Sequence, residues 1–341
     1  FYLNHTAVAA GRRPVVVTNN NSAYMTALDM RDHGIDVQAV IDTRSDIDED
    51  LEAELSKRQI PLFKGHTVLE TFGTFRVKAV RVEPLAGGKS LTLECDALFM
   101  SGGWTPSVHL HCHAGGKLAW NSELHAFTPD MQGWPDRAAA GAVAGVVDLE
   151  TALQQGYEAG KAAAGRAGYS TASPETPLPK AEQQRGEYGL KLGSDPYWAL
   201  PDDEAQPESQ KRHAKAFVDL QNDVTIEDLE LALKEGYKSP EHLKRYTTTG
   251  MATDQGKTGN LNALHIMGLL EGKSVPDIGV TTYRPPYSPQ TLGAMAGRGR
   301  HQFFAPVRVT PTRGGVRGCR DVETPVLFPA GRGDRGPCRT A

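Results

Sequence analysis

The sequence predicts an α/β protein in which a parallel-sheet domain is followed by a small helical domain. Residues 13–44 read as strand, helix and strand, and residues 15–17 form the continuous apolar run of a buried parallel strand. Between residues 216 and 272 the apolar residues recur at helical spacing instead, with capping residues between the segments. The 341 residues suffice for about two domains of ordinary size.

The β-α-β unit near the start of the chain is typical of a Rossmann-like half-domain. Its helix ends at Gly34, and "VQAVID" (37–42) forms the second strand. The turn after the first strand reads "TNNNSA" (18–23), where a dinucleotide-binding fold has G-x-G-x-x-G. Without glycine the backbone does not approach a pyrophosphate closely, although Asp42 stands where a ribose-binding acid is expected. We leave open a dinucleotide site and a fold that has lost its ligand. The helix residues expected in the core are Ala23, Ala27, Leu28 and Met30.

Further strands complete this domain. Residues 76–84 and 90–95 alternate like strands around the turn "AGGK", and "DALFMSGGW" (96–104) is a buried strand that enters a Gly-Gly turn. Gly102 and Gly103 let the backbone approach a phosphate or a ribose. This turn is therefore a better nucleotide candidate than "TNNNSA".

A strand-to-helix turn follows within residues 138–168. We expect a strand in its first part, small residues at the turn and a helix from about Leu149. Gly141 and Ala142 occupy the turn beside the helix N-terminus, where backbone amides attract phosphate. Residues 169–213 are rich in Pro, Ser, Glu and Gln, and this composition predicts a linker.

Capping residues divide the helical region into three helices. Thr225 begins the first, with Asp228 at the third position of a weak capping box. Ser239 caps the second, whose first residue is Pro240. The third covers about 260–270. One face of the first helix carries Ile226, Leu229 and Leu233, and the third helix stops at Gly272.

Composition excludes several classes of protein. The net charge is −4, which does not suggest a nucleic-acid binder, and no run of about 18 apolar residues predicts a membrane span. Four scattered cysteines are too few for a disulfide framework, and no signal peptide is recognisable, so we expect a cytoplasmic protein. The tail 313–341 is rich in Arg and Gly without aromatic interleaving. We expect disorder or an out-of-frame reading there rather than an RGG-type nucleic-acid segment.

"HLHCH" (109–113) raises the question of a metal site, since it contains three histidines and one cysteine. A zinc site needs ligands on converging faces, usually with a second, distant pair. These side chains are crowded in one segment without a partner motif such as C-x-x-C. We therefore expect a solvated segment and no metal.

"HLKRYTTTGMATDQGKTGN" (242–260) has the residues of a phosphate-binding loop. It is not a P-loop, because five residues instead of four separate Gly250 from Gly256 and a helix precedes it. Arg245, the Lys257-Thr258 pair and the Thr247–Thr249 run nevertheless offer cations and hydroxyls suited to a phosphate. A solvated turn between two helices is the alternative.

The same stretch resembles the small helical domain that follows the reductase fold in many amine-oxidising flavoproteins and is related to bacterioferritin-associated ferredoxin. Members that bind a [2Fe–2S] cluster carry four cysteines, at positions that correspond here to Asp219, Gln221, Asp254 and Gly259. None of these four residues is a cysteine. The resemblance therefore implies the scaffold without an iron–sulfur cluster, since the cluster is held by thiolates.

The cysteine-free version "KRYTTTGMATDQGKT", with "FVDLQNDVT" before it and "TTYRPPYSP" after it, resembles the α subunits of heterotetrameric sarcosine oxidases. The likeness covers residues 1–312 and includes "TNNNSAY", "SGGW" followed by Pro106, and an "AGA" turn. It implies an internal fragment of such a subunit. The expected domains are a partial Rossmann-like, flavoprotein-reductase-type domain (1–168), a linker (169–213), a small all-α domain without cluster cysteines (214–280), the truncated start of a folate-binding T-protein-like domain (281–312) and the tail (313–341).

The resemblance also implies a function. In that family sarcosine, O₂ and water give glycine, H₂O₂ and a one-carbon unit, as formaldehyde or methylene-tetrahydrofolate, with amine oxidation at FAD in the β subunit. The α subunit holds NAD⁺ non-catalytically and supplies one wall of an FMN site shared with β, and γ and δ subunits complete the complex. No catalytic residue and no metal ligand is expected in this chain. The implied FMN-phosphate residues are Arg245, Thr248, Thr249, Gln255, Lys257 and Thr258, and the implied NAD residues are Gly102, Gly103, Gly141 and Ala142.

Two other functions are kept. The chain could be a subunit of a related dye-linked amino-acid or opine dehydrogenase, although those proteins usually keep the cluster cysteines, and Asp254 and Gly259 speak against this. It could also be a scaffold fragment without chemistry of its own. Flavin absorbance and sarcosine-dependent peroxide in the presence of a β partner distinguish these functions.

Overall fold

The computed structural model of the chain describes residues 2–133, 137–169, 215–286, 288–296, 308–312 and 315–319. The chain divides into two compact units, residues 1–287 and 288–341. Apart from Tyr169, the linker expected at 169–213 lies outside the described residues.

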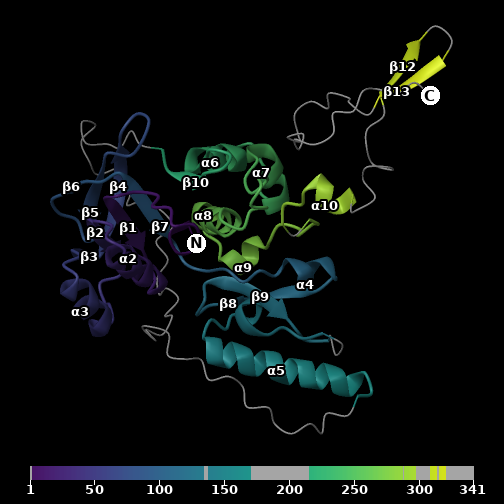
Figure 1. Cartoon of the computed structure of the whole chain (residues 1–341), viewed down its shortest axis with the longest axis horizontal. Coiled ribbons are helices and arrows are strands. Elements are labelled where there is room, and N and C mark those ends of the chain that lie inside the picture. Colours follow the sequence, from purple (N-terminus) through teal and green to yellow (C-terminus); the bar gives the residue numbers. More distant parts are fainter. Residues whose placement is uncertain are drawn as a thin grey trace. The chain divides into compact units, whose positions relative to one another are not determined.

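A four-stranded parallel sheet is the centre of the first domain (Figure 1). It consists of β1 (Pro14–Thr18), β2 (Ala39–Asp42), β3 (Leu62–Lys64) and β7 (Ala97–Ser101), in the order β3-β2-β1-β7. Helices α2 (Ser22–Asp32) and α3 (Glu49–Lys57) bury their apolar sides against it, in one cluster with Val16 and Val40. This confirms the predicted β-α-β unit. All four helix residues expected in the core are buried: Ala23, Ala27, Leu28 and Met30.

An antiparallel meander packs against the same sheet. It consists of β4 (His66–Phe72), β5 (Ala79–Pro84) and β6 (Leu91–Glu94), paired in that order. Val80 and Val82 are fully buried in a cluster with Val15 and Ile41 of the parallel sheet. The two predicted strands are confirmed, although each begins later than expected. Strand β4 was not predicted, because "HTVLETF" carries no strict alternation. Its pairing with β5 is also irregular, with a register shift between Val68 and Glu70.

The segment before the long helix differs from the prediction. The described residues 137–140 lie in no strand, and Gly141–Ala144 (η1) form one 3₁₀ turn, so the expected strand is wrong. Gly141 has φ +66°, which bends the chain away from an extended path. The helix start at Leu149 is confirmed, with Asp148 as its cap. The remaining elements of this part are α1 (Tyr2–Thr6), α4 (His109–His113), β8 (Lys117–Asn121), β9 (Ala126–Asp130) and α5 (Leu149–Arg166).

The helical region contains α6 (Ile226–Lys234), α7 (Pro240–Thr247), α8 (Asn260–Glu271) and α9 (Val275–Ile278). The capping box of Thr225 and Asp228 and the Ser239 cap with Pro240 are confirmed, and Gly272 ends α8 in the left-handed conformation. The region is not all-α, since β10 (Phe217–Asp219) and β11 (Val224–Thr225) form a short hairpin. The hairpin joins the core because Val218 and Val224 are buried with residues of the helices. That core consists of Val218, Val224, Leu229, Ala232, Leu243, Ala263, Ile266 and Met267.

The second unit contains α10 (Leu292–Ala296) and an antiparallel pair, β12 (Arg308–Thr312) and β13 (Gly315–Cys319). Strand β13 therefore lies within residues 313–341, for which we expected disorder or an out-of-frame reading. Antiparallel pairing uses main-chain groups, so it does not require an apolar alternation. The described residues 281–286 lie in no helix or strand.

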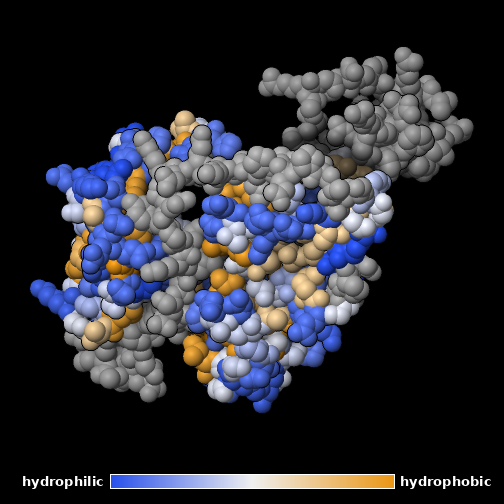
Figure 2. All heavy atoms as spheres, turned by 90° about the horizontal axis from the view of Figure 1, so that it is seen from below, coloured by the Kyte–Doolittle hydropathy of each residue, from blue (hydrophilic) through white to orange (hydrophobic). Residues whose placement is uncertain are grey.

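The visible face of the molecule mixes hydrophilic residues with small groups of hydrophobic ones (Figure 2). Several large apolar side chains are exposed, among them Met100, Trp104 and Leu110. Within the described residues no helix is long and apolar enough to cross a membrane.

Candidate functional site

The turn after β1 lies at the carboxyl edge of the parallel sheet, where ligands bind in open α/β sheets. Asn20 is fully buried there. Its side-chain oxygen accepts the backbone N–H of Ser22 at 3.1 Å, and its amide group donates to the Ser101 carbonyl at 3.0 Å. The Asn20 side chain thus bonds the first amide of α2, where a dinucleotide fold presents free amides to phosphate.

Asp42 ends β2 and is fully buried. The Tyr24 hydroxyl donates to one of its carboxylate oxygens at 2.8 Å, and the Arg44 guanidinium contacts both oxygens at 2.8 and 3.1 Å. Burial, and after it the charge of Asp42, raises the pKa of Tyr24 far above its usual range, so the phenol stays protonated. Both oxygens of the expected ribose-binding acid are therefore engaged within the chain.

The Gly-Gly turn after β7 stands beside the Asn20 turn. Asn19 donates to the Gly102 carbonyl at 3.2 Å, and Gly103 has φ +113°, which side-chain-bearing residues rarely adopt. The Trp104 indole N–H donates to the Ser22 hydroxyl at 3.0 Å, yet 60% of this residue is exposed. Gly102, Gly103 and an exposed aromatic ring therefore lie together at the carboxyl edge.

Gly141 and Ala142 lie apart from this edge in the sequence and belong to η1. The Gly141 amide donates to the Gln155 side chain at 2.9 Å, and a Cβ on Gly141 would lie 3.4 Å from the Cβ of Ala152. Gly141 thus packs onto α5, whereas Ala142 is exposed.

Two carboxylates organise the loop between α7 and α8. Asp219 is 2% exposed, and it accepts the amides of Gly250 at 2.7 Å and Gln221 at 2.9 Å. Asp254 accepts the Gly256 amide at 3.1 Å and both the amide and the hydroxyl of Thr258, at 3.1 and 2.5 Å. Burial alone would raise the pKa of Asp254, but these bonds and the nearby charge of Lys257 hold it below its ordinary value. The carboxylates therefore satisfy loop amides, which are then not available to a phosphate.

Asn260, at the start of α8, explains the two glycines of the loop. Gly250 and Gly256 have φ +67° and +73°. A Cβ on Gly250 would lie 1.9 Å from the Asn260 side-chain oxygen, and one on Gly256 would lie 2.3 Å from its nitrogen. The glycines therefore make room for Asn260 inside the loop.

The loop threonines bond to the protein. Thr249 is 2% exposed, and its hydroxyl lies 2.6 Å from that of Thr247, which donates to the Leu243 carbonyl. Thr248 adopts the left-handed conformation that ends α7, and its carbonyl accepts from Asn222. The side chains of Thr247, Thr249 and Thr258 and the main chain of Thr248 therefore shape the loop.

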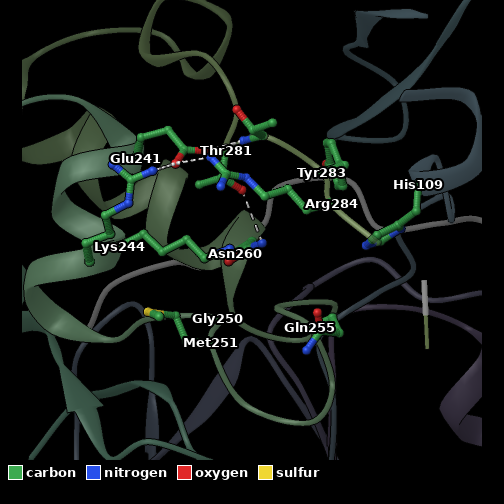
Figure 3. Close-up of a pocket in the computed structure, with 12 residues that line it drawn as sticks. His109, Glu241, Lys244, Gly250, Met251, Gln255, Asn260, Thr281, Tyr283 and Arg284 are labelled. Atoms are coloured by element: carbon green, nitrogen blue, oxygen red, sulfur yellow. Dashed lines mark hydrogen bonds and ion pairs between the residues drawn. The ribbon is translucent and has the colours of Figure 1, made fainter. Parts of the chain in front are cut away.

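A hollow of about 240 Å³ opens beside this loop (Figure 3). Its wall contains three basic side chains and one carboxylate, so two positive charges remain if His109 is neutral. Positive charge in a concave site attracts anions. The lining comes from α4, α7, the loop, α8 and the segment 281–284: His109, Glu241, Lys244, Arg245, Gly250, Met251, Gln255, Asn260, Thr281, Thr282, Tyr283 and Arg284.

Lys257 lines a smaller, neighbouring cavity of about 70 Å³. Four residues border both cavities, so the two lie next to each other. The wall of the smaller cavity is more apolar and includes Pro106, Phe127 and Leu264. The shared residues are His109, Asn260, Thr281 and Tyr283.

His109 corrects the prediction of a solvated "HLHCH" segment. The segment is the helix α4, and His109 is only 6% exposed. Its ring lies edge-on to Tyr283 with the centroids 4.7 Å apart. Burial, and then the charges of Lys257 and His113, lower the pKa of His109, so the ring is neutral near pH 7. Among the described residues no group of three metal-ligating side chains comes together.

The structure brings together only part of the predicted phosphate set. Arg245 and Gln255 line the hollow and Lys257 lines the neighbouring cavity, whereas Thr248, Thr249 and Thr258 line neither. Sequence reasoning missed several lining residues. Two signals were available: the "HLHCH" motif for His109, and the basic and aromatic run in "TTYRPP" for Tyr283 and Arg284. The main missed residues are His109, Glu241, Lys244, Asn260, Tyr283 and Arg284.

Comparison with known proteins shows which proteins this chain is similar to. Residues 213–298 match the sarcosine oxidase A3 domain. The chain is 36% identical over 312 residues to sarcosine oxidase subunit α of Rhizobium meliloti (strain 1021). The aligned region covers 91% of this chain and 29% of that protein. It is homologous to the α subunits of sarcosine oxidase. The corresponding subunit of Corynebacterium sp. (strain P-1) is also 36% identical, over 91% of this chain and 31% of that protein.

The chain thus spans about a third or less of the length of the sarcosine oxidase α subunits that it matches. Among solved structures, L-proline dehydrogenase from P. horikoshii aligns with a TM-score of 0.55 at 21% identity, over 86% of this chain and 52% of that one. This likeness shows a shared fold. It agrees with the predicted reductase-type α/β class, and the homology confirms the resemblance noted in the sequence.

Proposed function

We propose that this chain is part of the α subunit of a heterotetrameric sarcosine oxidase. The homology over 91% of the chain supports this proposal. The whole complex would convert sarcosine, O₂ and water to glycine, H₂O₂ and formaldehyde or methylene-tetrahydrofolate. Amine oxidation would take place at FAD in the β subunit, and γ and δ subunits would complete the assembly in the cytoplasm. In this proposal the chain carries binding sites and no catalytic residue.

The cationic hollow is the observation that carries the proposal. Its two net positive charges suit the phosphate of FMN, and guanidinium groups bind phosphate through paired N–H donors. When bound, FMN would supply electron transfer. About 240 Å³ is less than the 300–1,000 Å³ usual for a ligand site, which supports a wall that another chain completes.

The predicted FMN residues take different roles in this proposal. Arg245 and Gln255 would face the phosphate from the hollow, and Lys257 would approach it from the neighbouring cavity. Thr248, Thr249 and Thr258 would act indirectly, because their bonds shape the loop. Lys244 and Arg284 join the set as further cations of the wall.

The NAD part of the proposal fits less well. Asn20 occupies the amide that a pyrophosphate needs, and Asp42 is bonded to Arg44 and Tyr24. The turn after β1 therefore does not fit a pyrophosphate. Gly102 and Gly103 stay the candidates at this edge, whereas the Gly141 amide is bonded to Gln155 and Ala142 is exposed.

A related dye-linked amino-acid or opine dehydrogenase subunit is the alternative. We keep this alternative because the chain shares its fold with L-proline dehydrogenase. At the template positions, Asp219 and Asp254 bond to loop amides, and a Cβ on Gly259 would lie 3.3 Å from that of Asp219. We therefore expect no cluster in this chain. Iron and acid-labile sulfide in stoichiometric amounts in the purified protein would favour the dehydrogenase.

The test of the FMN proposal compares three ligands by calorimetry on the full chain: FMN, riboflavin and inorganic phosphate. We expect FMN and phosphate to bind and riboflavin to bind far more weakly, because only the first two carry the anion. Arg245→Ala should weaken both anions, and Arg58→Ala, at an ion pair outside the hollow, should not. Equal binding of FMN and riboflavin would contradict a phosphate site. Co-purification with a β partner should add flavin absorbance and sarcosine-dependent peroxide, and their absence would favour the scaffold function.

A further inference from the structure

Glu241 is the carboxylate among the basic side chains of the hollow. It lies in the first turn of α7. One of its oxygens accepts the backbone N–H of Thr282, and the other lies 3.1 Å from an Arg245 nitrogen and 4.0 Å from an Arg284 nitrogen. Both oxygens are thus engaged, one with the segment 281–284 and one with the guanidinium groups (Figure 3).

The two kinds of contact differ in exposure. The Glu241 side chain is 27% exposed, whereas those of Arg245 and Arg284 are 56% and 65% exposed. Glu241 is therefore the inner partner, and the guanidinium groups lie toward solvent. Ion pairs at such exposure contribute little to stability, so an incoming anion can compete for these arginines.

Charge then decides what can compete. With Glu241 ionised, three basic side chains and one carboxylate leave two positive charges on the wall, which balance a phosphate dianion. A monoanion offers the arginines no more charge than the carboxylate that they already contact. A dianion offers twice that charge, together with paired acceptor oxygens for a guanidinium.

We propose that Glu241 determines the specificity of the hollow, as an internal anion that competes for Arg245 and Arg284 so that only a dianionic ligand is held. This inference rests on the proposed function, because it takes a phosphate as the ligand. Glu241 also positions the wall, because its bond to the Thr282 amide ties the segment 281–284 to α7. The two roles involve different oxygens and can be separated by substitution.

The experiment uses the full chain with Glu241→Gln and Glu241→Ala. Glutamine removes the charge but keeps an oxygen that accepts the Thr282 amide, whereas alanine removes both. Calorimetry at pH 8 measures FMN, inorganic phosphate and acetate. At this pH the phosphate monoester of FMN, whose second pKa is about 6, is a dianion, and inorganic phosphate is mostly a dianion. In Glu241→Gln we expect phosphate and FMN to bind about tenfold tighter or more and acetate to gain measurable binding, where each tenfold corresponds to about 1.4 kcal/mol.

Hydrogen exchange of the Thr282 amide reports the positioning role. It should stay protected in Glu241→Gln and lose protection in Glu241→Ala. The matched control is Glu271→Gln, which removes a carboxylate paired with Lys273 at 3.0 Å outside the hollow and should leave the affinities unchanged. If the wild-type chain binds phosphate and Glu241→Gln binds it no more tightly, the specificity role is wrong and the proposed function stands. If neither binds phosphate or FMN, both are wrong.

Discussion

Asp219 shows how one buried carboxylate organises the loop of the helical domain. It accepts the amides of Gln221, Asn222 and Gly250, at 2.9, 3.4 and 2.7 Å. The position corresponds to a cluster cysteine in the resembling domains, so an acceptor of hydrogen bonds stands where others have a metal ligand. A carboxylate can hold a loop without a metal because charge-assisted hydrogen bonds are strong when buried.

Asp219→Ala should lower the free energy of unfolding by about 2–3 kcal/mol, because it leaves buried amide donors without a partner. Chemical denaturation measures this change. Asp46→Ala removes a carboxylate from an exposed loop position and should change stability little. Equal stability of the two variants would show that solvent replaces the Asp219 contacts without cost.

His265 is a second residue whose environment has a measurable effect. Burial lowers its pKa from the ordinary value of 6.5 to about 4, with a further contribution from His125, and its ring lies 5.6 Å from that of Trp120. Between these two pH values the unfolded chain binds a proton that the folded chain does not. Folding stability should therefore fall as the pH is lowered from about 6.5 to about 4.

His265→Phe removes the titration and keeps an aromatic ring, so the loss of stability between pH 6.5 and 4 should become shallower. The slope of unfolding free energy against pH measures it, with a maximum contribution of about 1.4 kcal/mol per pH unit from one group. His242→Phe, at an exposed position of α7, is the control. An unchanged slope in His265→Phe would mean that other groups cause the acid sensitivity.

At the scale of elements, the carboxyl edge of the parallel sheet has the fold of a dinucleotide-binding domain but few polar groups available to a ligand. The strands and α2 form as the apolar pattern requires. The polar residues at their ends bond to one another, as Asn20 does with Ser22 and Asp42 with Arg44. An edge whose hydrogen-bonding groups are satisfied internally has less to offer a dinucleotide.

We therefore expect this chain to bind NAD⁺ weakly, with a dissociation constant well above the micromolar range. Gly103→Ala should abolish the residual binding if the dinucleotide approaches that turn, because alanine is strained at φ +113°. Gly168→Ala, at φ +84° in open space, controls for the strain alone. Calorimetry of the isolated chain is the measurement, and micromolar affinity would contradict the expectation.

At the scale of the whole molecule, we propose that this chain forms one wall of a site that another chain completes. The chain covers about 30% of the length of its relatives. The volume of the hollow, about 240 Å³, is below the range usual for ligand sites. Residues from α4, α7, α8 and the segment 281–284 converge there, although they are far apart in the sequence. A partner wall would bury the exposed guanidinium groups and strengthen their charge-assisted bonds.

In a complex reassembled with a β partner, Lys257→Ala should lower FMN content or slow electron transfer to FMN, while FAD reduction by sarcosine persists. The substitution removes one cation beside the hollow. A hydrogen bond from such a charged group to the phosphate is worth roughly 1.5–3 kcal/mol. Flavin absorbance and rapid-mixing kinetics measure both quantities. Lys273→Ala, which loses a surface pair with Glu271, is the control. Unchanged FMN content and unchanged electron transfer to FMN would show that the loop is only a structural turn.

The sequence by itself determined the elements whose signals are local. A continuous apolar run located β1, and the apolar pattern located α2 and α6. Capping chemistry located the starts of α6 and α7, because these signals act within a few residues. The loop motif also carried the resemblance to sarcosine oxidase α subunits, and the homology confirms that resemblance. Where a local signal was weak, as in "HTVLETF" before β5, the strand was missed.

Only the tertiary structure decided which polar groups are available to a ligand. The threonines and glycines of the loop looked suited to a phosphate, but Asp219, Asp254 and Asn260 use their amides, hydroxyls or space. His109 was expected in a solvated segment, yet packing across more than a hundred residues of sequence brings it to the same hollow as Arg284. The physical reason is that hydrogen-bond partners and electrostatic neighbours are set by distance in space, whereas the sequence records only distance along the chain.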